Sequence, residues 1–380
     1  MAAPGGLIAR RAPDGGPLLP TGKGRLRAFR PDDIPDVVAL RRRAFRFSER
    51  VSPEALAAYL ERVFCHHPWP DEELPSLVYQ DEYGRLVGFL GVIPRPMRFQ
   101  GEDIRAAVAT QLMVAPESRG LTGRFLARAF FCGPQDLSLS DTANDAARRL
   151  WVSIGGSVSV SHSLSWLRPL RPARLLGARV AARGLLPRAL SVAARPLLNA
   201  VDALTARGGK AGSIPVTGVM EPLDPAVVAE AAEEVLGGYA LRPTYAAAAV
   251  AWLIDHAAEK RSFGRLEGMQ VRLSDGQVAG WFLCYANSGG ISQVVQLAAR
   301  PSARAMVLAH LCQFARARGA SAVEGRLDPA LLPDLAAQRA RLGHDGPWVL
   351  FHSPRPEILH AIECGDAFLS RLDGEWWLSF

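Results

Sequence analysis

The same order of helix-like and strand-like segments occurs twice along this chain, on either side of a segment without acidic residues. Between residues 24 and 167 the apolar spacing predicts a strand, two helices, a hairpin and a further strand, then a helix, a strand, a helix and a last strand. A fainter version of this order returns between residues 213 and 380, and its last apolar run, GEWWLSF at residues 374–380, predicts a further strand. We therefore expect an α/β (α+β) protein of two tandem domains, each with a mixed, mostly antiparallel central sheet flanked by helices.

The composition is that of an ordinary globular protein. The chain has 380 residues, 49% hydrophobic and 21% charged, which suits two or three domains. No window approaches the ~20 apolar residues of a membrane span. Residues 1–23 are rich in Gly and Pro and lack a signal-peptide core, so we expect a disordered tail and a cytoplasmic location. The five cysteines show no CxxC spacing, and no metal site is expected.

The positive charge is concentrated in one segment. Residues 146–201 contain nine arginines and no Asp or Glu, so the rest of the chain carries a net charge of −2 against +7 for the whole. We expect residues 168–212 to form a basic helical linker with solvated arginines. Peripheral contact of residues 168–201 with an anionic membrane surface, at the inner face, stays open. RNA is disfavoured because no aromatic residue lies between Leu167 and Val201, and no DNA partner is expected.

The stretch TQLMVAPESRGLTGRFLARAFF, residues 110–131, changes from an apolar strand to an amphipathic helix through a glycine-containing loop. A helix start leaves backbone N–H groups unpaired and attracts anions. Gly120 and Gly123 would let the backbone approach phosphate oxygens, and Arg119 and Arg124 could add charge-assisted hydrogen bonds. A tight turn needs one glycine at most, so the loop favours a phosphate-binding site.

Two elements in this half resemble the GCN5-related N-acetyltransferase (GNAT) superfamily. The run VAPESRGLTGRFL is similar to the family's V-x-P-x-x-R-G motif, and NDAARRLWVSIGG is similar to a second element that opens with Asn. The matching positions are Val114, Pro116, Arg119, Gly120, Asn144, Ala147, Leu150, Trp151 and Gly155. The resemblance covers residues 24–167 well and 213–380 weakly. Residues 213–380 are therefore expected to be a degenerate GNAT-like domain, since Pro301 to Arg304 replace the glycines of the loop.

The resemblance implies acetyl-CoA, or another acyl-CoA, as co-substrate and a small-molecule amine as acceptor. The acetyl group would pass directly to the amine in a ternary complex, with nearby amides polarising the thioester carbonyl. The implied cofactor-binding residues are Met113, Val114, Arg119, Gly120, Leu121, Thr122, Gly123, Arg124, Asn144, Arg148 and Trp151. Neither the acceptor nor the oligomeric state can be predicted.

The chain departs from the family pattern at the proton-transfer positions. Gln111 matches the position of the usual Glu base, and Trp151 matches that of the usual Tyr acid. Positioning of the two reactants can supply much of the acceleration without them. The expected catalytic residues are Gln111, which would orient the acceptor or a water, Asp141, the nearest carboxylate that could act as base, and Asn144, which would hold the cofactor or a water chain. Lesser candidates are Glu117, Tyr79 and His162.

Three functions are compatible with these motifs. The first is an N-acetyltransferase or wider acyltransferase using acetyl-CoA. The second is an aminoacyl or long-chain acyl transferase that acts on a membrane or envelope precursor. The third is a catalytically silent acyl-CoA-binding protein, which the residues at positions 111 and 151 make reasonable. Binding of CoA without turnover would favour the third.

Overall fold

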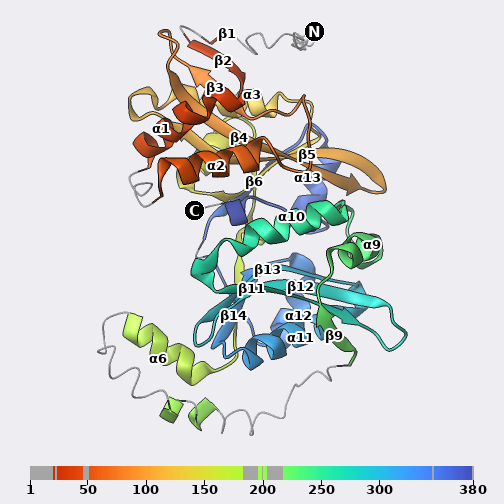
Figure 1. The fold of residues 1–380 in the computed structure, drawn as a ribbon. Coiled ribbons are helices and arrows are strands. Elements are labelled where there is room, and N and C mark those ends of the chain that lie inside the picture. The colour runs from red at the N-terminus through yellow and green to blue at the C-terminus, as the bar shows by residue number, and fades with distance from the viewer. Residues whose placement is uncertain are drawn as a thin grey trace.

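Two mixed sheets, each flanked by helices, make up the fold (Figure 1). The computed structural model describes residues 20–21, 24–45, 51–182, 196–198, 200–202, 217–344 and 346–378. Most of the expected N-terminal tail, and residues 183–195 and 203–216 of the expected linker, lie outside these ranges. The predicted fold class, with mostly antiparallel sheets and covering helices, is confirmed.

The first sheet has the order β1-β2-β3-β4-β5-β6-β16-β7, and β10 pairs with the C-terminal end of β4, residues Met97–Phe99. Its only parallel neighbours among the described strands are β5 and β6. The strands are β1 (Pro20–Thr21), β2 (Gly24–Ala28), β3 (Leu77–Gln80), β4 (Leu86–Phe99), β5 (Glu102–Val114), β6 (Leu137–Ala143), β7 (Ser157–Ser159), β10 (Leu241–Pro243) and β16 (Trp348–His352). The helices of this part are α1 (Ile34–Ala44), α2 (Pro53–Phe64), α3 (Leu121–Phe131), α4 (Asp145–Ser153) and α5 (Val160–Ser163).

The second sheet has the order β15-β8-β14-β13-β12-β11-β9, and β13 and β14 are parallel. Its strands are β8 (Ser165–Pro169), β9 (Val219–Pro222), β11 (Arg265–Arg272), β12 (Val278–Ala286), β13 (Ile291–Ala299), β14 (Ala322–Arg326) and β15 (Arg341–Gly343). The other α-helices are α6 (Pro172–Ala182), α9 (Pro225–Val235), α10 (Ala247–Ala258), α11 (Arg304–Ala317), α12 (Leu332–Ala337) and α13 (Pro356–Glu363). Short 3₁₀ turns include η3 (Pro116–Ser118) and η7 (Trp376–Leu378).

The two halves of the chain exchange strands. β16, from the C-terminal half, lies between β6 and β7 of the first sheet. β8, from the N-terminal half, lies between β14 and β15 of the second sheet. The sheets therefore do not follow the expected division of the chain at residue 167, although domain boundaries at 24–167 and 213–380 stay a prediction.

Two predicted strands are wrong. Residues 157–167 form β7, the short helix α5 and β8 rather than one strand, because the Ser159 hydroxyl accepts a hydrogen bond from the His162 N–H and starts a helical turn. The C-terminal run ends in η7 instead of a strand, where the Trp377 indole N–H donates to the Leu372 carbonyl at 3.0 Å. The sequence pattern also missed β10 and α13.

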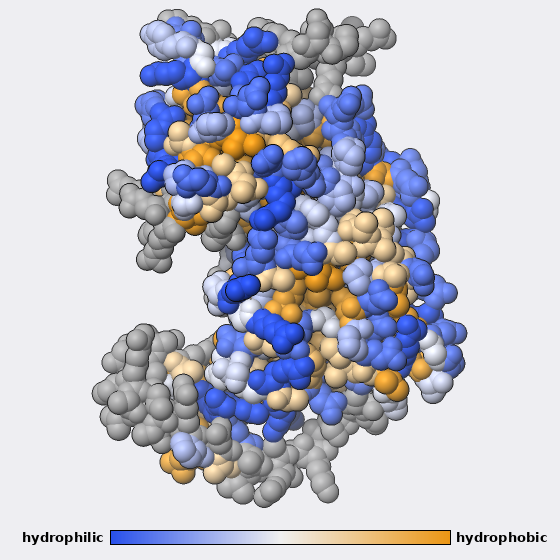
Figure 2. All heavy atoms as spheres, in the orientation of Figure 1, coloured by the Kyte–Doolittle hydropathy of each residue, from blue (hydrophilic) through white to orange (hydrophobic). Residues whose placement is uncertain are grey.

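One hydrophobic core joins the two sheets. Leu26, Leu60 and Phe89 of the first sheet and its helices belong to the same buried cluster as Tyr285 of the second sheet and Trp377 near the C-terminus. The surface seen in Figure 2 is mixed, with hydrophilic side chains around apolar areas in both halves. Within the described ranges, no helix is long and apolar enough to cross a membrane.

Candidate active site

A cavity of about 310 Å³ lies where β5 and β6 separate. Residues Ala106–Val108 of β5 pair in parallel with Leu137–Leu139 of β6. Beyond these residues the strands separate, and the backbone groups of one strand no longer bond to those of the other. The cavity walls come from α1, β4, β5, β6, α4 and the C-terminal segment (residues 370–378). The lining residues are Arg41, Phe45, Leu90, Ala109, Thr110, Gln111, Leu112, Ser140, Thr142, Ala143, Asn144, Ala147, Trp151, Glu375 and Leu378. The predicted residues Gln111, Asn144 and Trp151 thus meet at one site.

Gln111 lies at an irregularity of β5 and is held from two sides. Its φ of 50° is in the left-handed region, and the register of β4 with β5 shifts between Phe89 and Gly91. The Arg41 guanidinium donates to Gln111 Oε1 at 2.7 Å, and Gln111 Nε2 donates to the Tyr59 hydroxyl at 2.9 Å. A residue other than glycine keeps such a backbone conformation only when its surroundings enforce it. The Gln111 amide therefore faces the cavity in a fixed orientation, and its role toward acceptor or water stays a prediction.

The Tyr59 hydroxyl continues this chain to the C-terminal segment, where it donates to the Leu378 carbonyl. Burial raises the pKa of Tyr59, so the phenol stays neutral. Neither Tyr59 nor Arg41 was among the sequence candidates, because both act through partners far away in the chain. They connect α1 and α2 to the cavity wall, to which Arg41 and Leu378 both belong.

The glycine-containing loop leads from β5 into α3. Gly120 has a φ of 108° and stands at the N-cap, with no side chain capping the first turn. A Cβ added at Gly120 would meet no atom within 4 Å. In the described part of the chain, neither Arg119 nor Arg124 has a hydrogen-bond or ion-pair partner. An open, uncapped helix start with two arginines beside it fits a phosphate group.

Other predicted cofactor residues have packing roles. Met113 is buried in the core, so only its main chain can face a ligand. Gly123 is buried too, and a Cβ there would lie 3.7 Å from Val114 and 3.8 Å from Leu150, which is ordinary contact. Thr122 is buried and Leu121 is exposed. Gly123 therefore lies at the junction of β5, α3 and α4, and the open backbone belongs to Gly120.

α4 presents three of the predicted residues. Asn144 Oδ1 accepts a hydrogen bond from the Ala147 N–H at 2.9 Å, which caps the helix and explains why it begins there. Trp151 is buried against Phe131, with ring centroids 4.8 Å apart. Arg148 pairs with Asp145 at 3.2 Å. Asn144 and Trp151 line the cavity, whereas Arg148 does not.

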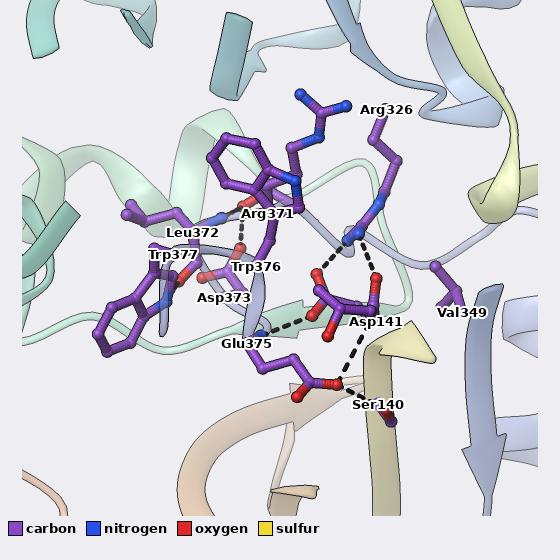
Figure 3. A network of polar contacts seen from close by, with 12 residues as sticks. Ser140, Asp141, Arg326, Val349, Arg371, Leu372, Asp373, Glu375, Trp376 and Trp377 are labelled. Carbon is purple, nitrogen blue, oxygen red and sulfur yellow. Dashed lines mark hydrogen bonds and ion pairs between the residues drawn. The ribbon is translucent and has the colours of Figure 1, made fainter. Parts of the chain in front are cut away.

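Asp141 is buried on the other face of β6 from the cavity, since its neighbours Ser140 and Thr142 line the cavity. Its Oδ2 pairs with Arg326 Nη1 at 2.6 Å, and its Oδ1 accepts the Glu375 N–H at 2.6 Å (Figure 3). Both carboxylate oxygens are thus engaged in joining β6, β14 and the C-terminal segment. The predicted role of Asp141 as base is not tested by these contacts, but they assign it a structural one.

The lesser candidates lie outside the cavity wall. Glu117 is exposed and pairs with Arg43 at 3.3 Å. Tyr79 is buried and stacks on Phe125. Burial lowers the pKa of His162 to about 4, so this imidazole is neutral near pH 7.

Glu375 is, like Arg41, a cavity residue that the sequence reasoning missed. Its Oε1 accepts hydrogen bonds from the Ser140 hydroxyl at 2.6 Å and from the Thr142 N–H at 3.3 Å. Burial first, and the charge of Asp141 second, raise the pKa of its carboxyl. A signal was present: an acid inside the apolar run GEWWLSF is costly to bury unless it has partners. The pattern of that run instead predicts a strand, which does not bring an acid into a site.

Comparisons with known proteins agree with this geometry. Residues 25–130 match the family model described as an acetyltransferase (GNAT) domain. No curated protein matches the chain. A probable N-acyltransferase from Enterococcus faecalis, described as a conserved protein of unknown function, aligns with a TM-score of 0.54 and 11% identity, over 87% of this chain and 72% of that one.

Two further solved structures are similar. A GCN5-related N-acetyltransferase from Anabaena variabilis aligns with a TM-score of 0.52 and 14% identity, over 86% of this chain and 72% of that one. A Saccharomyces cerevisiae N-myristoyltransferase with bound myristoyl-CoA and inhibitors aligns with a TM-score of 0.49 and 14% identity, over 90% and 86% of the two chains. Residues 25–130 therefore match an acetyltransferase (GNAT) domain model, in line with the motifs, and over most of its length the chain shares the fold of the Enterococcus faecalis and Anabaena variabilis proteins.

Proposed function

We propose that this protein transfers an acetyl group from acetyl-CoA to an amine of a small-molecule acceptor, by direct attack in a ternary complex. The observation that carries the proposal is the cavity between β5 and β6, which lies at the same end of β5 as the uncapped start of α3. A pyrophosphate on the helix start would place the thioester arm along the separated strands. The amine and the thioester would then meet beside Gln111, which supplies the positioning that direct transfer needs.

The predicted residues divide by position in this arrangement. Arg119, Gly120 and the first turn of α3, which includes Leu121, Thr122 and Gly123, would hold the phosphates, with Arg124 beside them. The main chain of Met113 and Val114 would follow the pantetheine arm and polarise the thioester carbonyl. The other side of the bound acyl-CoA would be bordered by α4 and its N-cap, through Asn144, Arg148 and Trp151.

A short acyl group suits the cavity. Its inner end is polar, with Thr110, Ser140 and Glu375 beyond the last paired residues of β5 and β6. Two further cavities at the junction of the sheets enclose about 30 Å³ each, space for a water molecule or two and not for a long chain. The polar inner end supports acetyl over the long-chain alternative, and we propose a cytoplasmic acetyltransferase rather than an enzyme that acts on a membrane precursor.

A silent acyl-CoA-binding protein is the second candidate. It is favoured by one contact pattern: the amide at the family's base position is fixed between Arg41 and Tyr59 and cannot take a proton. Binding and turnover must therefore be measured separately.

The first test is calorimetric titration of acetyl-CoA into the native protein and the Gly120→Glu variant. The new carboxylate would stand at the helix start beside the phosphates, and we expect roughly tenfold or greater loss of affinity, about 1.4 kcal/mol or more. Gly276→Glu is the matched control, because Gly276 also has a positive φ, of 83°, with no atom within 4 Å of an added Cβ. Gly276 lies in the turn between β11 and β12, so the Gly276→Glu variant should bind acetyl-CoA with native affinity.

No binding by the native protein, or equal loss in both variants, would overturn the assignment of the cofactor to this loop. If acetyl-CoA binds, release of free CoA is then followed with a panel of primary amines. Comparing acetyl-CoA with longer acyl-CoAs tests the chain length. Binding without release under all these conditions would establish the silent alternative.

A further inference from the structure

The C-terminal segment, residues 370–378, brings one carboxyl group into the site (Figure 3). Glu375 belongs to this segment, and Ser140 with its neighbours belongs to β6, more than two hundred positions earlier in the chain. The Glu375 N–H is held by Asp141, which is itself paired with Arg326. The backbone that carries this carboxyl is thus fixed by buried links to both sheets.

The carboxyl group faces the separated ends of β5 and β6. The Ser140 hydroxyl and the Thr142 N–H donate to its Oε1, and Thr110 on β5 lines the same cavity. Of the described residues that line the cavity, Glu375 is the one carboxylate. Gln111, at the position of the family's usual base, lines the same cavity. A proton acceptor is therefore present in the site, supplied by a different part of the chain.

We propose that Glu375 is the general base of the transfer reaction, a role that rests on the proposed function. The nitrogen of the neutral amine attacks the thioester carbon and a C–N bond forms. The proton that this nitrogen then loses passes to the Glu375 carboxylate. Collapse of the tetrahedral species breaks the C–S bond, and the sulfur leaves as thiolate. The proton passes from Glu375, through solvent, to the thiolate, so amide and free CoA are the products and the carboxylate is restored.

The surroundings of Glu375 suit this role. Burial and then the negative charge of Asp141 raise the pKa of Glu375 above its ordinary 4.5, which makes the carboxylate a stronger base. The charged groups nearby are Asp141 with Arg326 on the β6 and β14 side, and Arg41 on α1, which donates to Gln111. Tyr59 on α2 stays a neutral phenol. Glu375 is thus the carboxyl group of the cavity wall that is placed to accept a proton.

A purely structural role for Glu375, anchoring the C-terminal segment to β6, predicts different behaviour. Gln in its place keeps an oxygen that accepts from Ser140 and Thr142 and nearly the same volume, but it cannot take a proton. Glu375→Gln therefore preserves the anchor and removes the base. Glu363→Gln is the control, because Glu363 is an exposed acid at the end of α13 in the same part of the chain.

The experiment compares the native protein with both variants. Acetyl-CoA affinity is measured by calorimetry, and kcat is measured from pH 5 to 9 by CoA release, with the amine panel and with water as acceptor. For Glu375→Gln we expect unchanged affinity, a fall in kcat of roughly 100- to 10,000-fold, and loss of the acid limb of the pH profile. Glu363→Gln should match the native protein in all three.

Two results would overturn the inference. One is a Glu375→Gln variant that binds acetyl-CoA and keeps native kcat and pH profile. The other is a native protein that binds acetyl-CoA but acylates no amine and hydrolyses no thioester, since a base would then have no reaction to serve. Absence of acetyl-CoA binding by the native protein would instead overturn the proposed function, and the role of Glu375 with it.

Discussion

Gly374 shows at the residue scale why the C-terminal segment can approach β6 so closely. A Cβ at this position would lie 2.2 Å from Asp141 Cγ and 2.2 to 2.4 Å from its carboxylate oxygens, far inside contact distance. Asp141 cannot move away without losing its buried pair with Arg326. The sequence predicted a glycine in a terminal strand here, but it could not reveal this contact, because Asp141 and Gly374 meet only through the exchange of segments between the halves.

We therefore expect Gly374→Ala to lower the free energy of unfolding by about 3 kcal/mol, the cost of disturbing a buried ion pair. Gly346→Ala is the matched control, since a Cβ at that exposed glycine meets no atom within 4 Å. Urea unfolding followed by tryptophan fluorescence measures both. Equal stabilities of the two variants would show that the segment does not pack against Asp141 as described.

At the scale of elements, the predictions succeeded where the start signal is local. α2 begins at Pro53 because the Ser52 hydroxyl accepts the Ala55 N–H at 3.2 Å, and Ser at the N-cap followed by Pro at the first helical position is a start signal that the sequence alone displays. Residues 157–167 alternate like a strand, yet α5 interrupts them. The Ser159 hydroxyl caps α5 locally, but His162 also fixes the turn from a distance, since its Nε2 donates to the Ala367 carbonyl at 3.1 Å. A partner about two hundred positions away leaves no trace in a local pattern.

Because His162 is buried, we expect the free energy of unfolding to depend on pH. Burial lowers its pKa from 6.5 to about 4, so between these values the unfolded chain binds more protons than the folded one. The contribution of this group to the free energy of unfolding is therefore fully present above pH 6.5, and about 3 kcal/mol of it is lost as the pH falls to 4. Burial also lowers the pKa of His67 to about 4, which adds to the loss. His162→Gln should flatten the dependence measured by urea unfolding. The exposed His360→Gln should not, and equal slopes in both variants would contradict this account of α5.

At the scale of the whole molecule, the sequence predicted the fold class but not the connection between the halves, and the cofactor role of the loop in the first half stays a prediction. Periodicity identifies the run that becomes β16 as a strand without telling which sheet receives it. Its insertion between β6 and β7 and that of β8 between β14 and β15 leave each sheet dependent on both halves. The motifs of α3 and α4 were readable because they lie together in the chain, whereas Glu375 reaches them only through this exchange.

The exchange predicts that neither half folds alone. A chain of residues 1–210 lacks β16, which leaves β6 and β7 without a shared neighbour, and it lacks the segment that buries Trp377 in the common core. Residues 211–380 lack β8 and expose the edge of β14. Expressed separately, each fragment should be unfolded by circular dichroism or insoluble. Expressed together, the tagged N-terminal fragment should co-purify with the other at equal stoichiometry and regain acetyl-CoA binding. A monomeric, folded fragment 1–210 that binds acetyl-CoA with native affinity would show that the first half is an independent domain, and would leave the strands β8 and β16 as mere contacts.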